Sequence, residues 1–258
     1  MTVLIGTSGF SYKDWVGPVY PDDLPKSEWL GHYAGEFATC ELNFSYYRIP
    51  NASTLERMAA KVGDGFLFTV KAFQGITHER QEPEPQMRQF TQALAPLIDD
   101  GKFACVLAQF PHSFHANAEN RDYLKRVREG FGGLSVVVEF RSREWITDQT
   151  FDELRALDLG FCCVDQPRFE SLVPPVAVAT GPVAYVRFHG RNYKKWWKHD
   201  QAWERYDYSY SDDELKEWVD KIHQLDEEAP LTLVYMNNHW QGQAVSTARQ
   251  LRMLLDET

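Results

Sequence analysis

Charged and amide side chains stand at the carboxyl ends of most of the short apolar runs in this sequence of 258 residues. In one such run, Val136, Val138 and Phe140 follow one another at intervals of two positions and share an apolar face. Because successive side chains along a strand point to opposite faces, Glu139 and Arg141 share the other face. An acid and a base are thereby placed together at the end of one strand.

The same alternation predicts polar faces at the ends of the other runs. The residues assigned to this shared interior face are Glu41, Asn43, Thr69, Lys71, Gln109, Glu139, Arg141, Asp165, Arg187, His189 and Asn237. Carboxylates and an imidazole can exchange protons near neutral pH, and guanidinium groups bind carboxylate or phosphate groups. The pattern therefore indicates a site for an anionic or polyhydroxy ligand. A paired salt-bridge plug without a ligand is the structural alternative.

We assign catalytic roles to Glu41, Lys71, Glu139 and His189. Arg187, Arg141 and Lys71 are expected to hold the negative group of the substrate, Glu139 or Glu41 to act as general base, and His189 as acid partner. Lys71 could also form a Schiff base, although an ion pair is the more common role for such a lysine. The substrate-binding candidates are Asn43, Gln109, Arg141, Asp165, Arg187, Arg191, Asn192, Tyr193, Asn237 and Asn238.

A long basic and aromatic segment, Gly190–Tyr210, follows the seventh apolar run. Its lysines and arginines alternate with Trp and Tyr residues, which predicts a lid or platform over the site. A solvated loop whose rings pack on the rim of the fold is the alternative.

A divalent metal is a further alternative, and we assign no cofactor. The ligand types suit zinc or manganese at Glu41, Glu139, Asp165, His189 and His78. The neighbouring cations would compete with a metal for these carboxylates, and the sequence has no H-E-x-x-H motif.

The elements that must position these residues alternate between strand-like and amphipathic patterns. The predicted strands are Val3–Thr7, Thr39–Asn43, Phe66–Lys71, Phe103–Gln109, Ser135–Arg141, Phe161–Asp165, Val183–His189 and Leu231–Asn237. The predicted helices are Ser27–Phe37, Ser53–Lys61, Pro85–Ile98, Ala118–Glu129, Thr147–Leu157, Ser211–Leu225 and Ala244–Leu255. This order predicts a single α/β domain over residues 1–258, a TIM-type (β/α)8 barrel. An open doubly wound sheet is less favoured because G-x-G-x-x-G is absent.

Charge and composition narrow the function classes. The net charge of −10 argues against binding nucleic acid or an anionic membrane through overall charge, although a local basic groove stays open as an option. No apolar run approaches the ~18 residues of a membrane span, and Met1–Phe10 lacks the pattern of a signal peptide. We expect a cytoplasmic protein. The cysteines lie in apolar runs, which predicts buried reduced thiols.

Motifs along nearly the whole chain resemble those of the DUF72 proteins, also called the YecE-like family. The matching segments are Ile5-Gly6-Thr7-Ser8-Gly9-Phe10, Glu41-Leu42-Asn43, Val70-Lys71, Ile76-Thr77-His78, Gln109-Phe110-Pro111, Glu139-Phe140-Arg141, Arg187-Phe188-His189-Gly190-Arg191-Asn192, Arg205-Tyr206-Asp207-Tyr208 and Asn237-Asn238. The resemblance implies a TIM-type barrel and supplies no reaction. Phe44 and Tyr46 stand where the family commonly has Ser and Phe, and His239-Trp240 where small residues are usual, which predicts an altered pocket shape.

The leading hypothesis is an enzyme that acts on a small anionic or polyhydroxy substrate, such as a sugar phosphate, by hydrolysis, isomerisation or lyase chemistry. A second hypothesis is a metal-dependent phosphodiesterase acting on nucleic acid, similar to barrels of the endonuclease IV type. A third is a ligand-binding protein without catalysis. The sequence sets no oligomeric state.

Overall fold

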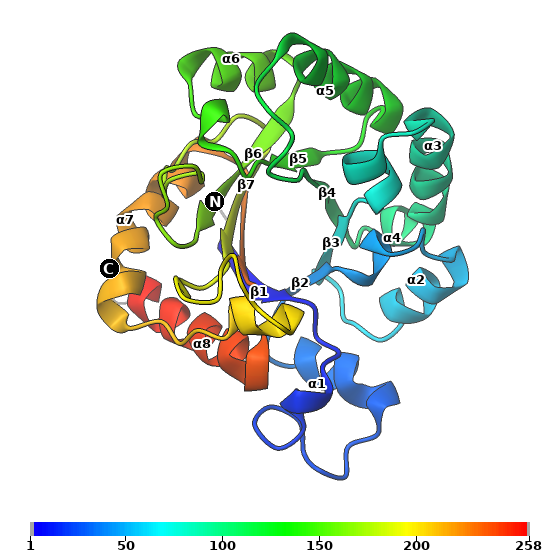
Figure 1. The fold of residues 1–258 in the computed structure, drawn as a ribbon. Helices are drawn as coiled ribbons and strands as arrows, with labels where there is room; N and C mark the ends of the chain where they lie inside the picture. Colours follow the sequence, from blue (N-terminus) through cyan, green and yellow to red (C-terminus); the bar gives the residue numbers. More distant parts are fainter. Residues whose placement is uncertain (1–2, 257–258) are drawn as a thin grey trace.

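The computed structural model describes residues 3–256, and its strands form one closed parallel barrel in sequence order. Figure 1 looks along the barrel, with the strands in a ring and the helices outside it. The strands are β1 (Val3–Ser8), β2 (Thr39–Leu42), β3 (Leu67–Lys71), β4 (Phe103–Gln109), β5 (Val136–Glu139), β6 (Leu159–Asp165), β7 (Val183–Phe188) and β8 (Leu231–Met236). The prediction of a TIM-type (β/α)8 barrel is confirmed.

The helices follow the predicted segments, with shifted ends. They are α1 (Trp29–Ala34), α2 (Ala52–Ala59), α3 (Pro83–Ala93), α4 (Ala95–Asp99), α5 (Ala118–Phe131), α6 (Asp148–Ala156), α7 (Asp212–Glu228) and α8 (Gln243–Asp256). The side chain of Ser211 accepts a hydrogen bond from the Glu214 amide, and Glu214 reciprocates, so a capping box starts α7. The single helix expected over Pro85–Ile98 is two helices, because Pro96 has no amide hydrogen and, in a continuous helix, its ring would clash with the carbonyl four residues earlier.

Alternation along the strands separates an apolar outer face from a polar interior. Phe140 stacks on Trp145 with ring centroids 4.3 Å apart, and Phe188 packs against Trp218 of α7. Inside the barrel, the hydroxyl of Tyr235 forms hydrogen bonds with Thr39 and Thr69. The apolar outer face packs against the helices. The interior face holds polar side chains, which continue to the carboxyl ends of the strands.

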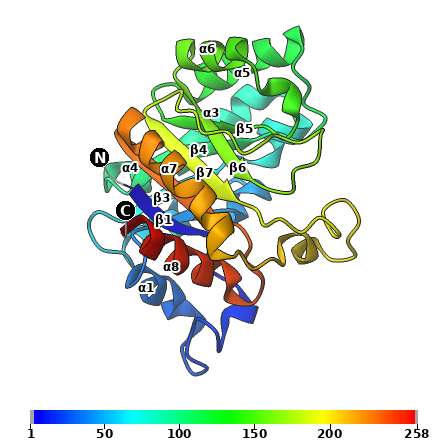
Figure 2. The same cartoon turned by 90° about the vertical axis from the view of Figure 1, so that its left-hand side faces the viewer.

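The long connections gather at the carboxyl ends of the strands. Figure 2 shows the segment that follows β7 projecting beyond that end, in yellow, and the segment that follows β1 lying on the same side. All four cysteines are buried and free, as predicted. Within residues 3–256, no helix has both the length and the apolar character needed to cross a bilayer.

Candidate functional site

A cavity of about 870 Å³ opens at the carboxyl ends of the strands. Six of the predicted site residues line it, namely Asn43, Lys71, Gln109, Arg141, Arg187 and Asn237. They come from six different strands or from the residues that closely follow them. A parallel barrel places its active sites at this end, where the loops can change without disturbing the barrel.

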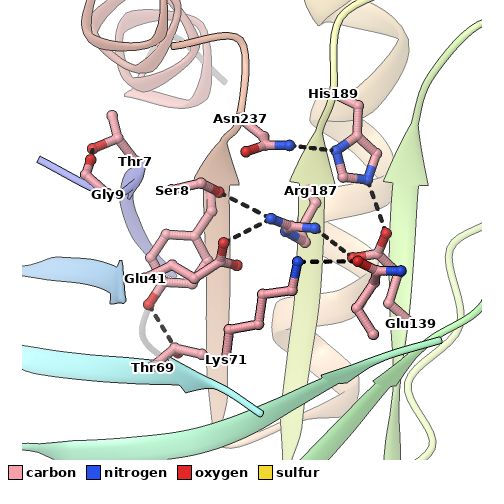
Figure 3. Close-up of polar contacts among 12 residues, drawn as sticks. Thr7, Ser8, Gly9, Glu41, Thr69, Lys71, Glu139, Arg187, His189 and Asn237 are labelled. Atoms are coloured by element: carbon pink, nitrogen blue, oxygen red, sulfur yellow. Dashed lines mark hydrogen bonds and ion pairs between the residues drawn. The ribbon is translucent and has the colours of Figure 1, made fainter. Parts of the chain in front are cut away.

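Arg187 lies at the centre of a buried charge cluster below the cavity (Figure 3). One guanidinium nitrogen donates to Glu139 Oε2 at 2.6 Å, and another donates to Glu41 Oε1 at 2.7 Å. The other oxygen of Glu41 accepts a hydrogen bond of 2.6 Å from the hydroxyl of Tyr185. Buried carboxylates are tolerated where each has such partners. The cluster therefore fixes three strands of the barrel relative to one another.

Glu139 has its carboxylate fully occupied. Besides Arg187, it is paired with Arg141 at 2.9 Å and with the Nε2 atom of His189 at 3.0 Å. Burial alone would raise the pKa of Glu139, but the Arg141 and Arg187 guanidinium groups outweigh it and hold the pKa well below its usual range. Glu139 therefore stays ionised and is a poor proton acceptor.

His189 is held as a neutral imidazole. Burial, together with the Arg141 charge, lowers the pKa of His189 to about 3. Because Glu139 is ionised, Nε2 carries the hydrogen and donates to it, while Nδ1 accepts from the Asn237 side-chain amide at 3.0 Å. Both ring nitrogens are therefore occupied, and the fully buried ring is not among the residues that line the cavity.

Lys71 is a cation next to this cluster. Among residues 3–256, no carboxylate lies within ion-pair distance of its amine, whereas Arg141 and Arg187 are both paired. Its amine donates to Gln109 Oε1 at 3.0 Å and lies 4.6 Å from the ring centroid of Tyr46. Burial, followed by repulsion from Arg187, lowers the pKa of Lys71 to about 8. The side chain is partly exposed and lines the cavity. It can therefore meet a ligand directly.

The prediction that Asp165 faces the interior is wrong. Its carboxylate accepts hydrogen bonds from Trp218 of α7 at 2.8 Å, from Tyr210 at 2.7 Å and from Arg191 at 2.7 Å. Asp165 lies four residues after Phe161, so the two share the outer face. Alternation counted from Phe161 would have given the correct side.

Four more predicted binding residues lie outside the cavity lining. Asn238 directly follows Asn237 and so points the opposite way, donating to Thr247 of α8 at 3.0 Å. Arg191 is held by Asp165 and Glu217. Asn192 donates to two backbone carbonyls within its own loop, and the hydroxyl of Tyr193 accepts from the Arg168 amide. These residues shape the long loop that follows β7.

The cavity lining also contains aromatic residues and two outer cations that are not among the assigned catalytic and substrate-binding residues. Phe44, Tyr46 and His239, which were expected to change the pocket shape, are among them. These lining residues are Phe10, Tyr12, Lys26, Phe44, Tyr46, Tyr47, Arg48, Tyr206 and His239. Their positions could have identified them, because most of them lie in the segments that follow β1, β2 or β8. Of the predicted platform over Gly190–Tyr210, Tyr206 reaches the lining, whereas Trp196 is buried and Trp197 is half exposed.

The predicted metal ligands are poorly arranged to bind a metal ion. Among residues 3–256, no three His, Cys, Asp or Glu side chains come together as metal ligands. The carboxylate oxygens of Glu41 and Glu139 already accept from arginine, tyrosine or histidine. Asp165, one of the predicted ligands, faces the outer helices.

Comparisons with known proteins agree with this architecture. Residues 4–258 match the family model described as "Protein of unknown function DUF72". The UPF0759 protein YunF of Bacillus subtilis is 33% identical over 270 residues, covering 98% of this chain and 95% of its own. A DUF72 family crystal structure from Thermotoga maritima has a TM-score of 0.92 at 37% identity, covering 99% of this chain and 100% of its own. One from Enterococcus faecalis has a TM-score of 0.88 at 26% identity, covering 99% and 96%. The chain therefore belongs to the DUF72 family.

Proposed function

We propose that this protein is an enzyme that binds a small organic anion in the cavity and transfers a proton through Lys71. The observation that carries the proposal is the Lys71 amine, which lies in the cavity wall among arginines and has no carboxylate within ion-pair distance in residues 3–256. The cavity volume of about 870 Å³ suits a small molecule.

Charge balance within the cluster supports an anionic ligand. Lys71, Arg141 and Arg187 carry positive charge, whereas Glu41 and Glu139 carry negative charge. His189 is neutral, so one positive charge is left uncompensated. A carboxylate or phosphate group placed against the cavity-facing cations would balance it.

The lowered pKa of Lys71 supports a role in proton transfer. With a pKa of about 8, roughly one tenth of the amine is unprotonated at pH 7, compared with a negligible fraction for an ordinary lysine. Enzymes commonly bring a catalytic lysine into this range by burial and nearby charge. The amine can then take a proton from the bound substrate and return it at another position.

This proposal moves the acid–base role away from the carboxylates and His189. Glu139 is ionised and saturated with donors, and His189 is neutral and bonded through both nitrogens. We propose that Glu41, Glu139 and His189 are positioning residues. They orient Arg187 and Arg141 so that these cations and Lys71 converge on one anionic group.

Turnover of candidate anions from a metabolite library, followed by product analysis, tests the proposal. Lys71→Met should abolish turnover of any substrate so found. Lys102→Met is the matched control. Lys102 is also partly buried, but it directly precedes β4, near the opposite end of the barrel, and its amine donates to the Ala59 carbonyl of α2. The proposal fails if the Lys71 variant turns over substrate as fast as the Lys102 variant.

A further inference from the structure

The cavity has two chemically different halves around the barrel. Consecutive strands β3 and β4, and the residues just after β5, supply Lys71, Gln109 and Arg141 on one side. The segments that follow β7, β8, β1 and β2 supply rings on the other side, together with the outer cations Lys26 and Arg48. The lining rings of this aromatic half are Phe10, Tyr12, Phe44, Tyr46, Tyr206 and His239. The two halves meet at Tyr46, whose ring centroid lies 4.6 Å from the Lys71 amine. A ligand that contacts Lys71 therefore also lies next to the rings.

Several of these rings are fixed before any ligand binds. Tyr12 stacks on His239 with ring centroids 4.4 Å apart and 5° between the ring planes. The Tyr12 hydroxyl donates to the Ser8 carbonyl at 2.5 Å, and Tyr206 lies 5.9 Å from His239. All three rings stay partly exposed. Rings held in this way offer a packing surface at little further loss of conformational entropy.

The aromatic half also contains polar atoms without partners. Asn43 Oδ1 and His239 Nδ1 are both shielded from solvent, and neither has a hydrogen-bond partner among the described residues. Both residues line the cavity. A buried polar atom without a partner is unfavourable, so a ligand hydroxyl that donates to Asn43 Oδ1, or that forms a hydrogen bond with His239 Nδ1, gains affinity. A purely apolar ring would leave both atoms unsatisfied.

We propose that the ligand is a sugar ring that carries one anionic group. The anionic group contacts Lys71, Arg141 and Arg187. The C–H face of the ring packs against the aromatic half, and a ring hydroxyl donates to Asn43 Oδ1. This inference rests on the anion site of the proposed function and adds the substrate class. Sugars suit such a surface because they combine apolar C–H faces with hydroxyl groups at the ring edge.

Isothermal titration calorimetry at pH 7 with matched probes tests the inference. The probes are inorganic phosphate, glucose 6-phosphate, glucuronate and phenyl phosphate. We expect glucose 6-phosphate, glucuronate or both to bind at least about tenfold more tightly than phosphate. This gain in affinity corresponds to one or two net hydrogen bonds together with the ring contact. Which of the two binds more tightly distinguishes a phosphate from a carboxylate as the anionic group.

Variants assign that gain to named residues. Asn43→Leu and Tyr206→Ala should each remove most of the advantage of the sugar-bearing probe and leave the affinity for inorganic phosphate unchanged. Tyr193→Ala is the matched control, because Tyr193 lies on the same loop as Tyr206, is half exposed and is outside the cavity lining. Unchanged phosphate affinity also shows that each variant is folded.

The outcomes separate this inference from the proposed function. If phosphate binds but neither sugar probe binds more tightly, or if Tyr206→Ala behaves like Tyr193→Ala, the sugar assignment is wrong and the anion site stands. Phenyl phosphate binding more tightly than both sugar probes, with no effect of Asn43→Leu, would likewise overturn it. If no anion binds to the wild-type protein, the proposed function itself fails.

Discussion

Removing the guanidinium group of Arg187 should expose how strongly the buried cluster depends on it. In Arg187→Met, Glu41 and Glu139 lose a partner that donates at 2.7 and 2.6 Å, respectively. Both carboxylates are fully buried, so water cannot replace that partner without opening the barrel mouth. Methionine fills much of the vacated volume, which keeps the perturbation electrostatic.

The expected loss is large. Removing one partner from a buried ion pair lowers the free energy of unfolding by about 3–5 kcal/mol. Here one arginine serves two carboxylates, so we expect a loss at or above the upper end of that range. Because domains are stable by only about 5–15 kcal/mol, this loss is a large part of the total.

Urea unfolding at pH 7 measures the loss, and a second variant identifies its cause. In Arg187→Met/Glu41→Gln/Glu139→Gln the buried charges that Arg187 served are gone, so most of the lost stability should return. The reasoning is refuted if Arg187→Met stays within about 1 kcal/mol of the wild-type protein, or if the triple variant is no more stable than the single one.

The pH dependence supplies an internal check. In the wild-type protein the pKa of Glu139 is well below its unfolded value, so its stabilising contribution is present above pH ~4.3 and is lost as the pH falls through the folded pKa. In Arg187→Met, burial acts on Glu139 with less opposing charge, which raises its pKa. The stability deficit of the variant should therefore shrink as the pH is lowered from 7 towards 5.

Three further predictions concern single groups. Asp165→Ala removes the acceptor shared by Arg191, Tyr210 and Trp218, so the free energy of unfolding should fall by about 3 kcal/mol with unchanged sulfate affinity; wild-type stability would contradict this. The ¹⁵N shifts of His189 should stay constant from pH 5 to pH 8 and report hydrogen at Nε2, because its pKa is about 3; a titration midpoint inside that range would disprove the assignment. Sulfate, whose charge is constant over this range, should bind about tenfold more weakly at pH 9 than at pH 7 as Lys71 loses its proton, and Lys71→Met should abolish that dependence; an equal dependence in the variant would exclude Lys71 as the cause.

The alternating order of strand-like and helical patterns predicted the fold, and the period of two along the strands predicted the centre of the site. Glu41, Glu139 and Arg187 were placed in the interior by counting from apolar neighbours, and the structure brings them into direct contact. The assignment of Asp165 failed because this count was not applied to its strand. Asp165 was assigned inward because it ends a strand, although Phe161 on the same strand shares its face.

The loops could not be predicted in this way, because they have no period. Tyr206 reaches the cavity from a loop whose course is set by Asn192, which donates to the carbonyls of Glu204 and Asp207. Such contacts depend on backbone positions that no sequence spacing specifies. The proton states could not be predicted from spacing either, because the low pKa of His189 arises from burial and from Arg141, which follows a different strand, β5.

The most direct test of the central claim is the pKa of Lys71, measured by NMR from the ¹³Cε shift of selectively labelled lysine with and without sulfate. Lys71→Met assigns the signal. We predict a pKa of about 8 for Lys71 in the free protein and a higher pKa with sulfate bound, because the anion stabilises the protonated amine. A pKa of ~10.4, the ordinary value for lysine, that sulfate does not change would contradict it.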